Sequence, residues 1–177
     1  LVLPAVYDSI SEVAPDRIVR MVRGGVVQYM DLHEYKLPVG NVFTQVKLKD
    51  GRHGNKFFPA QIGGAYGFVD YLGRVRIGPQ FDDVEPFAEE LAPVRLGNEW
   101  GYLTKLENLA IQPDFEAAGP FVNGYAVVKK KGKWGLINKE GKFLITNKFD
   151  RIEWNAYGNY LVWEGDKMGI YNGQNFT

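Results

Sequence analysis

Residues 125–150 read YAVVKKKGKWGLINKEGKFLITNKFD, and they contain three short runs of β-forming residues. The first two runs are separated only by Lys131-Gly132, a connection typical of a hairpin with a primed turn, because such turns need positive φ angles. A second turn at 139–141 leads to a third run that starts at Phe143, and a corner follows at 147–150. We therefore expect three short antiparallel strands, followed by a corner that can carry a fourth.

The same pattern recurs along the chain with a period of 34 residues. An aromatic residue or methionine followed by glycine forms one column, and a phenylalanine followed by an acidic residue forms a second. These columns contain Tyr66-Gly67, Trp100-Gly101, Trp134-Gly135 and Met168-Gly169, and then Phe81-Asp82, Phe115-Glu116 and Phe149-Asp150. Turn-forming pairs make a third column in the same register. Agreement between three columns identifies a repeat protein.

The clear repeats occupy residues 63–177, and residues 1–62 hold degenerate copies of the same unit. One of these copies lies near Phe43, and an irregular loop near 49–56 interrupts the pattern. We count about five units of ~34 residues each and assign all of 1–177 to a single domain. No segment has a sustained period of 3.6 residues, so we predict an all-β chain with almost no helix.

Two architectures fit tandem antiparallel hairpins of this kind. In the repeat register, Leu1 aligns with Phe143 at the start of a third strand, and Thr177 falls at the same point of the last unit. A five-bladed propeller closed by pairing of its N- and C-terminal strands fits these ends, and so does a cut through a longer array. We favour an open superhelical β-array, in which each unit contacts only its neighbours. The mid-unit start without Met favours a mature or excised piece of a larger protein.

The composition argues against several classes of function. The 177 residues include 21 basic and 21 acidic ones, and this balance disfavours binding of nucleic acid or of an anionic membrane. Cysteine is absent, which removes disulfides, thiolate metal sites and thiol catalysis. No run approaches ~18 consecutive apolar residues, so we expect no membrane span.

The sequence offers no catalytic, cofactor or metal site. The two histidines, His33 and His53, have no clustered ligands at metal-site spacing. The two serines, Ser9 and Ser11, do not lie in a Gly-x-Ser-x-Gly setting, and no phosphate-binding glycine loop occurs. We therefore predict that the protein is not an enzyme and holds no cofactor.

The residues in the repeat columns have a structural interpretation. We expect the rings of Trp100 and Trp134 to pack between strands, with the following glycine leaving space for them. The acidic residue at each corner is expected to accept backbone N–H bonds, as carboxylates at turns do. This applies to Asp8, Asp82, Glu116 and Asp150.

Trp163 and Trp154 lie outside the repeat columns and are candidate partner-binding residues. Trp163 occupies the position of Arg95 and Lys129, next to a valine column that we take to mark the buried face. Because strand faces alternate, we expect Trp163 to point outward. Trp154 occupies a position that holds proline in the preceding copies. The alternative is that the final unit covers a hydrophobic end, as capping units do.

The segment GKWGLINKEGK at 132–142, with the Phe149-Asp150 corner, resembles the WG-repeat family of bacterial proteins. Residues 121–128, FVNGYAVV, are similar to the element that follows the corner in that family. Tyr66 and Met168 depart from it in the tryptophan column. The resemblance implies an all-β repeat that is usually one part of a larger bacterial protein. It carries no catalytic residues or cofactor, and it favours the periplasm or cell surface over the cytoplasm.

We therefore expect a non-enzymatic interaction or scaffold module of a bacterial, envelope-associated assembly, which binds a protein partner through an exposed β face. The alternative is a module that binds carbohydrate or another cell-envelope polymer, with its aromatic residues as stacking platforms. Ten tyrosines and four tryptophans make this alternative chemically reasonable.

Overall fold

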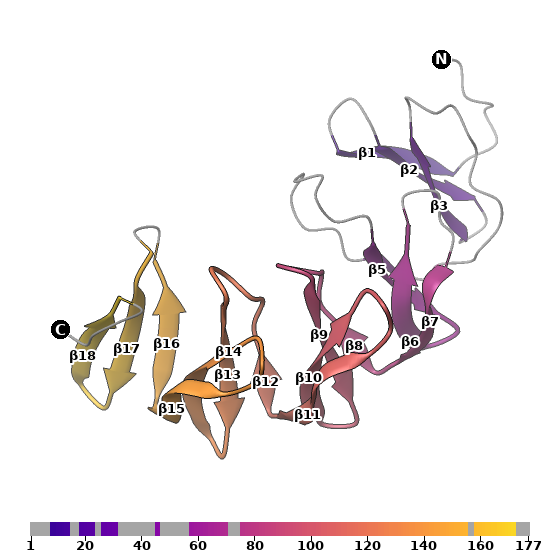
Figure 1. Cartoon of the computed structure of the whole chain (residues 1–177). Coiled ribbons are helices and arrows are strands. Elements are labelled where there is room, and N and C mark those ends of the chain that lie inside the picture. Colours follow the sequence, from indigo (N-terminus) through magenta and orange to yellow (C-terminus); the bar gives the residue numbers. More distant parts are fainter. Residues whose placement is uncertain are drawn as a thin grey trace. The chain divides into compact units, whose positions relative to one another are not determined.

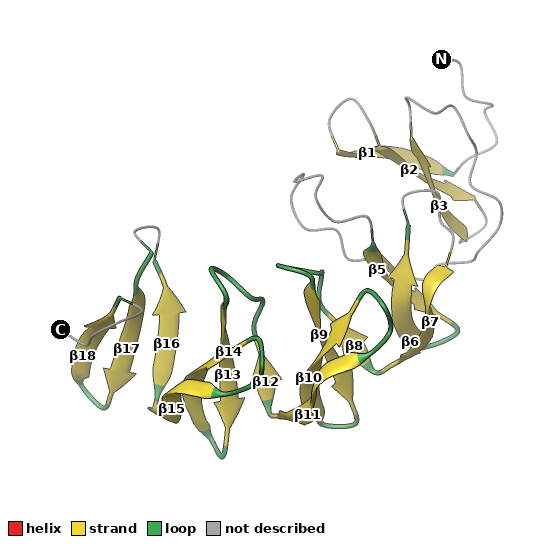
Figure 2. Cartoon of the chain, viewed as in Figure 1, coloured by secondary structure: helices red, strands yellow, loops and turns green. Residues whose placement is uncertain are grey.

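The computed structural model describes residues 8–14, 18–23, 26–31, 45–46, 57–70, 75–155 and 158–172. Every regular element in these ranges is a β-strand (Figure 2), which confirms the predicted all-β class. Accordingly, no described helix is long and apolar enough to cross a membrane. The expected copy near Phe43, the loop near 49–56 and the alignments of Leu1 and Thr177 lie outside the described residues.

Backbone contacts divide the chain into two compact units, residues 1–87 and 88–177. The prediction of a single domain over 1–177 stays a prediction. Unit 1 contains a sheet in the order β1-β2-β3 and a second sheet in the order β4-β5-β6-β7 (Figure 1). Its strands are β1 (Ser9–Ala14), β2 (Ile18–Arg23), β3 (Val26–Asp31), β4 (Gln45–Val46), β5 (Phe58–Ile62), β6 (Ala65–Val69), β7 (Val75–Phe81) and β8 (Asp83–Val84).

Unit 2 contains three successive antiparallel sheets, which we call the first, middle and last blade. The first blade holds β9 (Leu91–Leu96), β10 (Glu99–Thr104) and β11 (Leu109–Phe115). The middle blade holds β12 (Ala117–Ala118), β13 (Tyr125–Lys130), β14 (Lys133–Asn138) and β15 (Phe143–Phe149). The last blade holds β16 (Arg151–Trp154), β17 (Tyr160–Glu164) and β18 (Lys167–Tyr171). Among the described residues the strands form separate open sheets and no closed barrel, as an open repeat array requires.

The predicted hairpin at Lys131-Gly132 is confirmed. β13 and β14 have the predicted bounds and pair from Lys130↔Lys133 onward. Both turn residues have positive φ, 52° at Lys131 and 74° at Gly132. This is the conformation that a primed two-residue turn requires.

The strand at each corner of unit 2 belongs to the following sheet, an assignment that the sequence left open. β12 pairs with β13 through Ala117↔Lys129, and β16 pairs with β17 through Arg151↔Trp163. The backbone N–H of Glu116 and that of Asp150 also donate across the corner, to the carbonyls of Lys129 and Trp163 respectively, both at 2.8 Å. The chain therefore crosses from one sheet to the next at every corner of unit 2.

The repeated glycine makes room for backbone, and not for the neighbouring ring as the sequence had suggested. A Cβ built on Gly67, Gly101 or Gly135 would lie 2.4 to 2.7 Å from the carbonyl oxygen of an isoleucine in the third strand. The third strand bulges at this point, because the strand register shifts across the glycine and shifts again after the following residue. Only glycine permits so close an approach between two backbones.

The core of unit 2 lies between its blades and repeats with the sequence period. Five positions of one hydrophobic cluster recur 34 residues later in a second cluster. The first cluster joins the first and middle blades through Leu91, Tyr102, Phe115, Phe121, Ala126, Val128 and Ile137. The second joins the middle and last blades through Leu136, Ile145, Phe149, Ile152, Tyr160, Val162 and Tyr171. Both faces of the middle blade are therefore packed.

Replacing Gly101 by alanine is expected to destabilise unit 2, because the added Cβ meets the Ile111 carbonyl oxygen at 2.5 Å. Overpacking a core costs roughly 1–3 kcal/mol and occasionally more, and backbone yields less readily than a side chain. We expect a loss of about 3 kcal/mol in the free energy of unfolding, measured by urea titration with far-ultraviolet circular dichroism.

Gly78→Ala in β7 is the matched control, since nothing lies within 4 Å of the Cβ that it adds. We expect this variant to be as stable as the wild type. Equal losses for the two variants would contradict the role given to the repeated glycine.

Candidate partner-binding surface

The two faces of each blade in unit 2 have different neighbours. We call the face that packs on the following blade the forward face, and the opposite one the backward face. In the middle blade, Leu136 on the forward face is completely buried, and it shares a cluster with Ile152 and Val162, which are buried on the backward face of the last blade. The column of Arg95, Lys129 and Trp163 belongs to the forward face. In the first two blades this face packs on the next blade. The prediction from alternating strand faces, that this column points outward to solvent, is therefore wrong for these two blades.

A basic residue lies beside each tryptophan of the repeat column. Arg95 pairs across the hairpin with Trp100, and Lys129 pairs with Trp134. The Arg95 guanidinium carbon and the Lys129 Nζ each lie 5.9 Å from the centroid of the paired ring. Trp100 and Trp134 also pack against the two hydrophobic clusters with their partly buried rings. Both tryptophans therefore contribute to packing between blades.

The last blade reverses this arrangement. Trp163 stands at the basic position and pairs with Met168, which stands at the tryptophan position. The cation comes instead from the strand at the corner, because Arg151 pairs with Trp163 and its guanidinium carbon lies 4.5 Å from the indole centroid. Trp163 is half-buried, whereas Met168 is 59% exposed.

The forward face of the last blade also carries Leu161 and Ile170, which pair with each other and are both half-buried. Ile170 stands 34 residues after Leu136, a residue that is fully buried in the middle blade. Among the described residues of unit 2, no further blade covers this face. Leu161, Trp163, Met168 and Ile170 together form the surface that we call the terminal face.

Trp154 lies on the other side of the sheet from Trp163. It pairs with Tyr160 on the backward face, the face that also carries Ile152. The rings of Trp154 and Tyr160 are 4.9 Å apart in an edge-on arrangement, and Trp154 remains 36% exposed. The structure therefore does not bring the two candidate tryptophans together, and their partner-binding roles stay predictions.

Two of the corner carboxylates, those of Glu116 and Asp150, accept backbone N–H bonds, as expected. The Glu116 carboxylate accepts from the N–H of Gly132 at 3.0 Å, and that of Asp150 accepts from the N–H of Gly165 at 2.8 Å. Each glycine lies in the hairpin turn of the following blade, so each carboxylate ties a corner to the next hairpin. The Gly165 N–H bond, and then the hydrogen bond from Lys133, lower the pKa of Asp150.

A second connection between blades was not found from the sequence. The Glu89 carboxylate accepts the N–H of Gly124 at 2.8 Å and forms an ion pair with Lys139 at 3.2 Å. Partial burial opposes ionisation of Glu89, but the hydrogen bond from Gly124 and the interaction with Lys139 outweigh it and lower its pKa. Burial, and to a lesser extent the charges of Tyr125 and Glu89, raise the pKa of Tyr160 to about 12. No column predicts this contact, because Asn123 replaces the carboxylate one period later.

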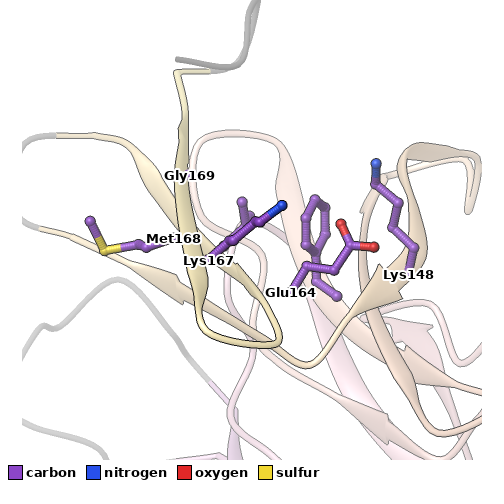
Figure 3. Close-up of a pocket in the computed structure, with 7 residues that line it drawn as sticks. Lys148, Glu164, Lys167, Met168 and Gly169 are labelled. Atoms are coloured by element: carbon purple, nitrogen blue, oxygen red, sulfur yellow. The ribbon is translucent and has the colours of Figure 1, made fainter.

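A cavity of about 240 Å³ lies between the end of β15 and the β17–β18 hairpin (Figure 3). Its charged lining consists of Lys148, Glu164 and Lys167, and Phe149 and Val162 line its apolar part together with Met168 and Gly169. Figure 3 shows the Met168 side chain on the opposite side of β18 from Glu164 and Lys148. Among the residues with described placement, no three His, Cys, Asp or Glu side chains are grouped so as to hold a metal ion.

Asp150→Asn is expected to make the protein less stable at pH 7 and to flatten the pH dependence of its stability. The lowered pKa means that ionised Asp150 stabilises the folded state above about pH 4, the unfolded value. This contribution disappears as the pH falls through the folded pKa. The difference in free energy of unfolding between wild type and variant, measured by urea titration, should therefore shrink as the pH falls from about 5 to about 2. This is the pH range in which a carboxylate with a lowered pKa becomes protonated.

Asp114→Asn serves as the control for this experiment. It removes the exposed ion pair with Lys130 but leaves the corner-to-turn bonds of Glu116 and Asp150 in place. We expect a smaller loss at pH 7, because exposed pairs contribute little. An Asp150→Asn variant whose stability parallels the wild type at every pH would contradict the assignment.

Solved structures with a similar fold come from proteins of low sequence identity. A Kluyveromyces lactis Hsv2 with loop 6CD replaced by a Gly-Ser linker has a TM-score of 0.55 and 11% identity, over 96% of this chain and 65% of that one. A structure described as the eukaryotic initiation factor has a TM-score of 0.58 and 12% identity, over 99% of this chain and 53% of that one. Kluyveromyces marxianus Hsv2 has a TM-score of 0.52 and 10% identity, over 96% of this chain and 62% of that one.

At these identities the likeness concerns the fold alone, which is that of propeller-like β-repeat proteins. The chain spans less than two thirds of the length of these structures. No curated protein sequence matches it. Its sequence matches the family described as "WG containing repeat" over three consecutive segments, 66–100, 100–134 and 134–167, which together cover more than half of the chain. The chain therefore belongs to the WG-repeat family.

Proposed function

We propose that this protein is a non-enzymatic interaction module that binds a protein partner through the terminal face, within a bacterial, envelope-associated assembly. One observation carries the proposal. The forward face of the middle blade is closed by the next blade, with Leu136 fully buried and Trp134 half-buried. On the same face of the last blade the counterpart of Leu136, Ile170, is only half-buried, and Met168, at the position of Trp134, is 59% exposed beside Trp163. Among the described residues, the terminal face thus has apolar residues like those of a forward face that packs on another blade, but no blade covers it.

The side chains of the terminal face suit recognition of a protein. Trp, Met and Arg are enriched in the centres of protein interfaces, and Trp and Arg are frequent hot-spot residues. Here the Arg151 guanidinium lies over the Trp163 ring, and Met168 is the cross-strand partner of Trp163 on the other side. The contact with Arg151 restricts the ring, so part of its rotamer entropy is lost before binding. Met168 adds a flexible apolar side chain that adapts to irregular surfaces.

The preceding blades indicate which chemistry covers such a face. Tyr102 of the first blade packs against Ala126, Val128 and Ile137 of the middle blade. A partner that presents small and branched apolar side chains on a β surface would therefore complement the terminal face. The non-enzymatic part of the proposal rests on the residue inventory, which lacks cysteine and contains two histidines and two serines. The envelope location rests on the family resemblance.

Carbohydrate binding is the second candidate function, and Trp154 is the residue that favours it. Its ring rests on Tyr160 and is 36% exposed at the edge of the backward face. A fixed, exposed aromatic ring suits stacking against a sugar. Because Trp154 and Trp163 lie on opposite faces, variants of the two residues separate the two functions.

We expect immobilised wild-type protein to retain a protein partner from a bacterial envelope fraction, and Trp163→Ala to retain at least about tenfold less of it, as for loss of a hot spot. Quantitative mass spectrometry measures the retained protein. Leu106→Ala is the matched control, because Leu106 is 81% exposed and lies outside the terminal face. It should retain the partner as the wild type does.

The proposal would be contradicted by a retained protein that Trp163→Ala binds as well as the wild type. Loss of retention in Trp154→Ala, with release of the wild type by soluble glycan, would instead support carbohydrate binding. Circular dichroism of each variant establishes that the fold is intact.

A further inference from the structure

The sequence Asn123-Gly124 is one at which a polypeptide can modify itself. Hydroxide takes the proton of the glycine N–H, and the nitrogen attacks the asparagine side chain, since glycine has no Cβ to hinder the approach. The N–Cγ bond forms, the Cγ–Nδ2 bond breaks, and ammonia leaves after taking a proton from water. A second water molecule then opens the cyclic imide to aspartate or isoaspartate. Of the two Asn-Gly sequences in the chain, this one lies wholly within the described residues.

These two residues form the tip of a hairpin turn with positive φ, 52° at Asn123 and 84° at Gly124. Val122 and Tyr125 close the turn through two backbone hydrogen bonds, of 2.8 and 3.2 Å. The hydroxyl of Tyr160 in the last blade donates to the Val122 carbonyl at 3.3 Å. Asn123 itself is exposed, so water reaches it. Protection of this site therefore has to come from contacts of the main chain and not from burial of the side chain.

The Glu89 carboxylate holds the nitrogen that would attack. It accepts the Gly124 N–H at 2.8 Å and forms its ion pair with Lys139. The lowered pKa of Glu89 keeps this carboxylate ionised at neutral pH. A hydrogen bond from an N–H to an ionised carboxylate is stronger than one between neutral groups, and the negative charge disfavours loss of the N–H proton. The contact therefore opposes the first step of the reaction.

The backbone that presents Glu89 is unusual. Glu89 and Glu90 form the tip of the equivalent turn one period earlier, between Ala88 and Leu91, with φ angles of 49° and 75°. Residues other than glycine seldom adopt positive φ, and a turn of this kind prefers Asn-Gly. Backbone strain of this sort is often found where a side chain has a functional contact. Here it accompanies a carboxylate that reaches from one turn to the next.

We propose that Asn123-Gly124 is a deamidation site that Glu89 keeps unreactive while the first and middle blades are packed together. Separation of the two blades removes the carboxylate from the Gly124 N–H, and deamidation follows. The isoaspartate product adds a methylene group to the main chain, which the closed two-residue turn does not accommodate. Separation of these blades thus becomes irreversible. The inference goes beyond the proposed partner-binding function and does not depend on it.

Peptide mapping by mass spectrometry, after incubation of the full chain in mildly alkaline buffer, tests the inference. We expect Asn123 of the wild type to deamidate at least tenfold more slowly than the same residue in a synthetic peptide of residues 121–128, FVNGYAVV. Glu89→Ala should deamidate at Asn123 at least fivefold faster than the wild type, because the Gly124 N–H loses its acceptor. Hydrogen exchange of this variant should be faster at the Gly124 amide, with the core amides of β13 and β14 still protected.

Glu90→Ala is the matched control, because Glu90 lies in the same turn, also with positive φ, but pairs with Lys105 instead of Gly124. It should deamidate at the wild-type rate. Glu89→Gln keeps the shape of the side chain and a neutral acceptor, so it tests the inference even if Glu89→Ala fails to fold. Its rate should exceed that of the wild type by a smaller factor. A wild type that deamidates as fast as the peptide, or Glu89 variants that both deamidate no faster than Glu90→Ala, would overturn the inference.

Discussion

The strands β7, β11 and β15 each run so close to the strand before them that only glycine fits between the two backbones. The distances of 2.4 to 2.7 Å from a Cβ built at Gly67, Gly101 or Gly135 exclude any other residue without a backbone shift. This contact fixes the bulge and the register of these strands. In unit 2 the register sets Phe115 and Ile111, and Phe149 and Ile145, on the face that meets the next blade. The repeated core between blades follows from it.

Among the described residues, the middle and the last blade of unit 2 differ in how much of their surface is packed. The middle blade has both faces packed, and its corner and turn are tied to neighbours by Glu116 and Asp150. The last blade uses its backward face in the same way, through Ile152, Tyr160 and Val162. Its forward face and the outer edge of β18 have no such cover among the described residues. We propose that the last blade recognises the partner, because its forward face is exposed among the described residues, whereas the forward faces of the other two blades of unit 2 are packed on the next blade.

The sequence predicted local structure well, because the relevant interactions are local. The Lys131-Gly132 turn, the bounds of β13 and β14 and the carboxylate-to-backbone bonds follow from residues close in the chain or repeated in register. The features that the sequence did not predict depend on strand pairing at the corners and on packing between blades. The pairing of Arg151 with Trp163 assigns the corner strand to the following blade, and the packing of Leu136 buries a face that alternation alone had assigned to solvent. Trp154 and Trp163 fall on opposite faces for the same reason, since their relation is set by strand pairing.

Amide hydrogen exchange of the full chain tests the central claim most directly. β14 is paired on both sides, so its amides should all be protected, whereas those amides of β18 that point away from β17 should exchange as fast as amides in open turns. Alternating fast and slow exchange along 167–171, with uniform protection along 133–138, is the predicted result. Uniform protection of β18 to the level of β14 in the isolated protein would mean that its edge is already occupied, and it would contradict the account.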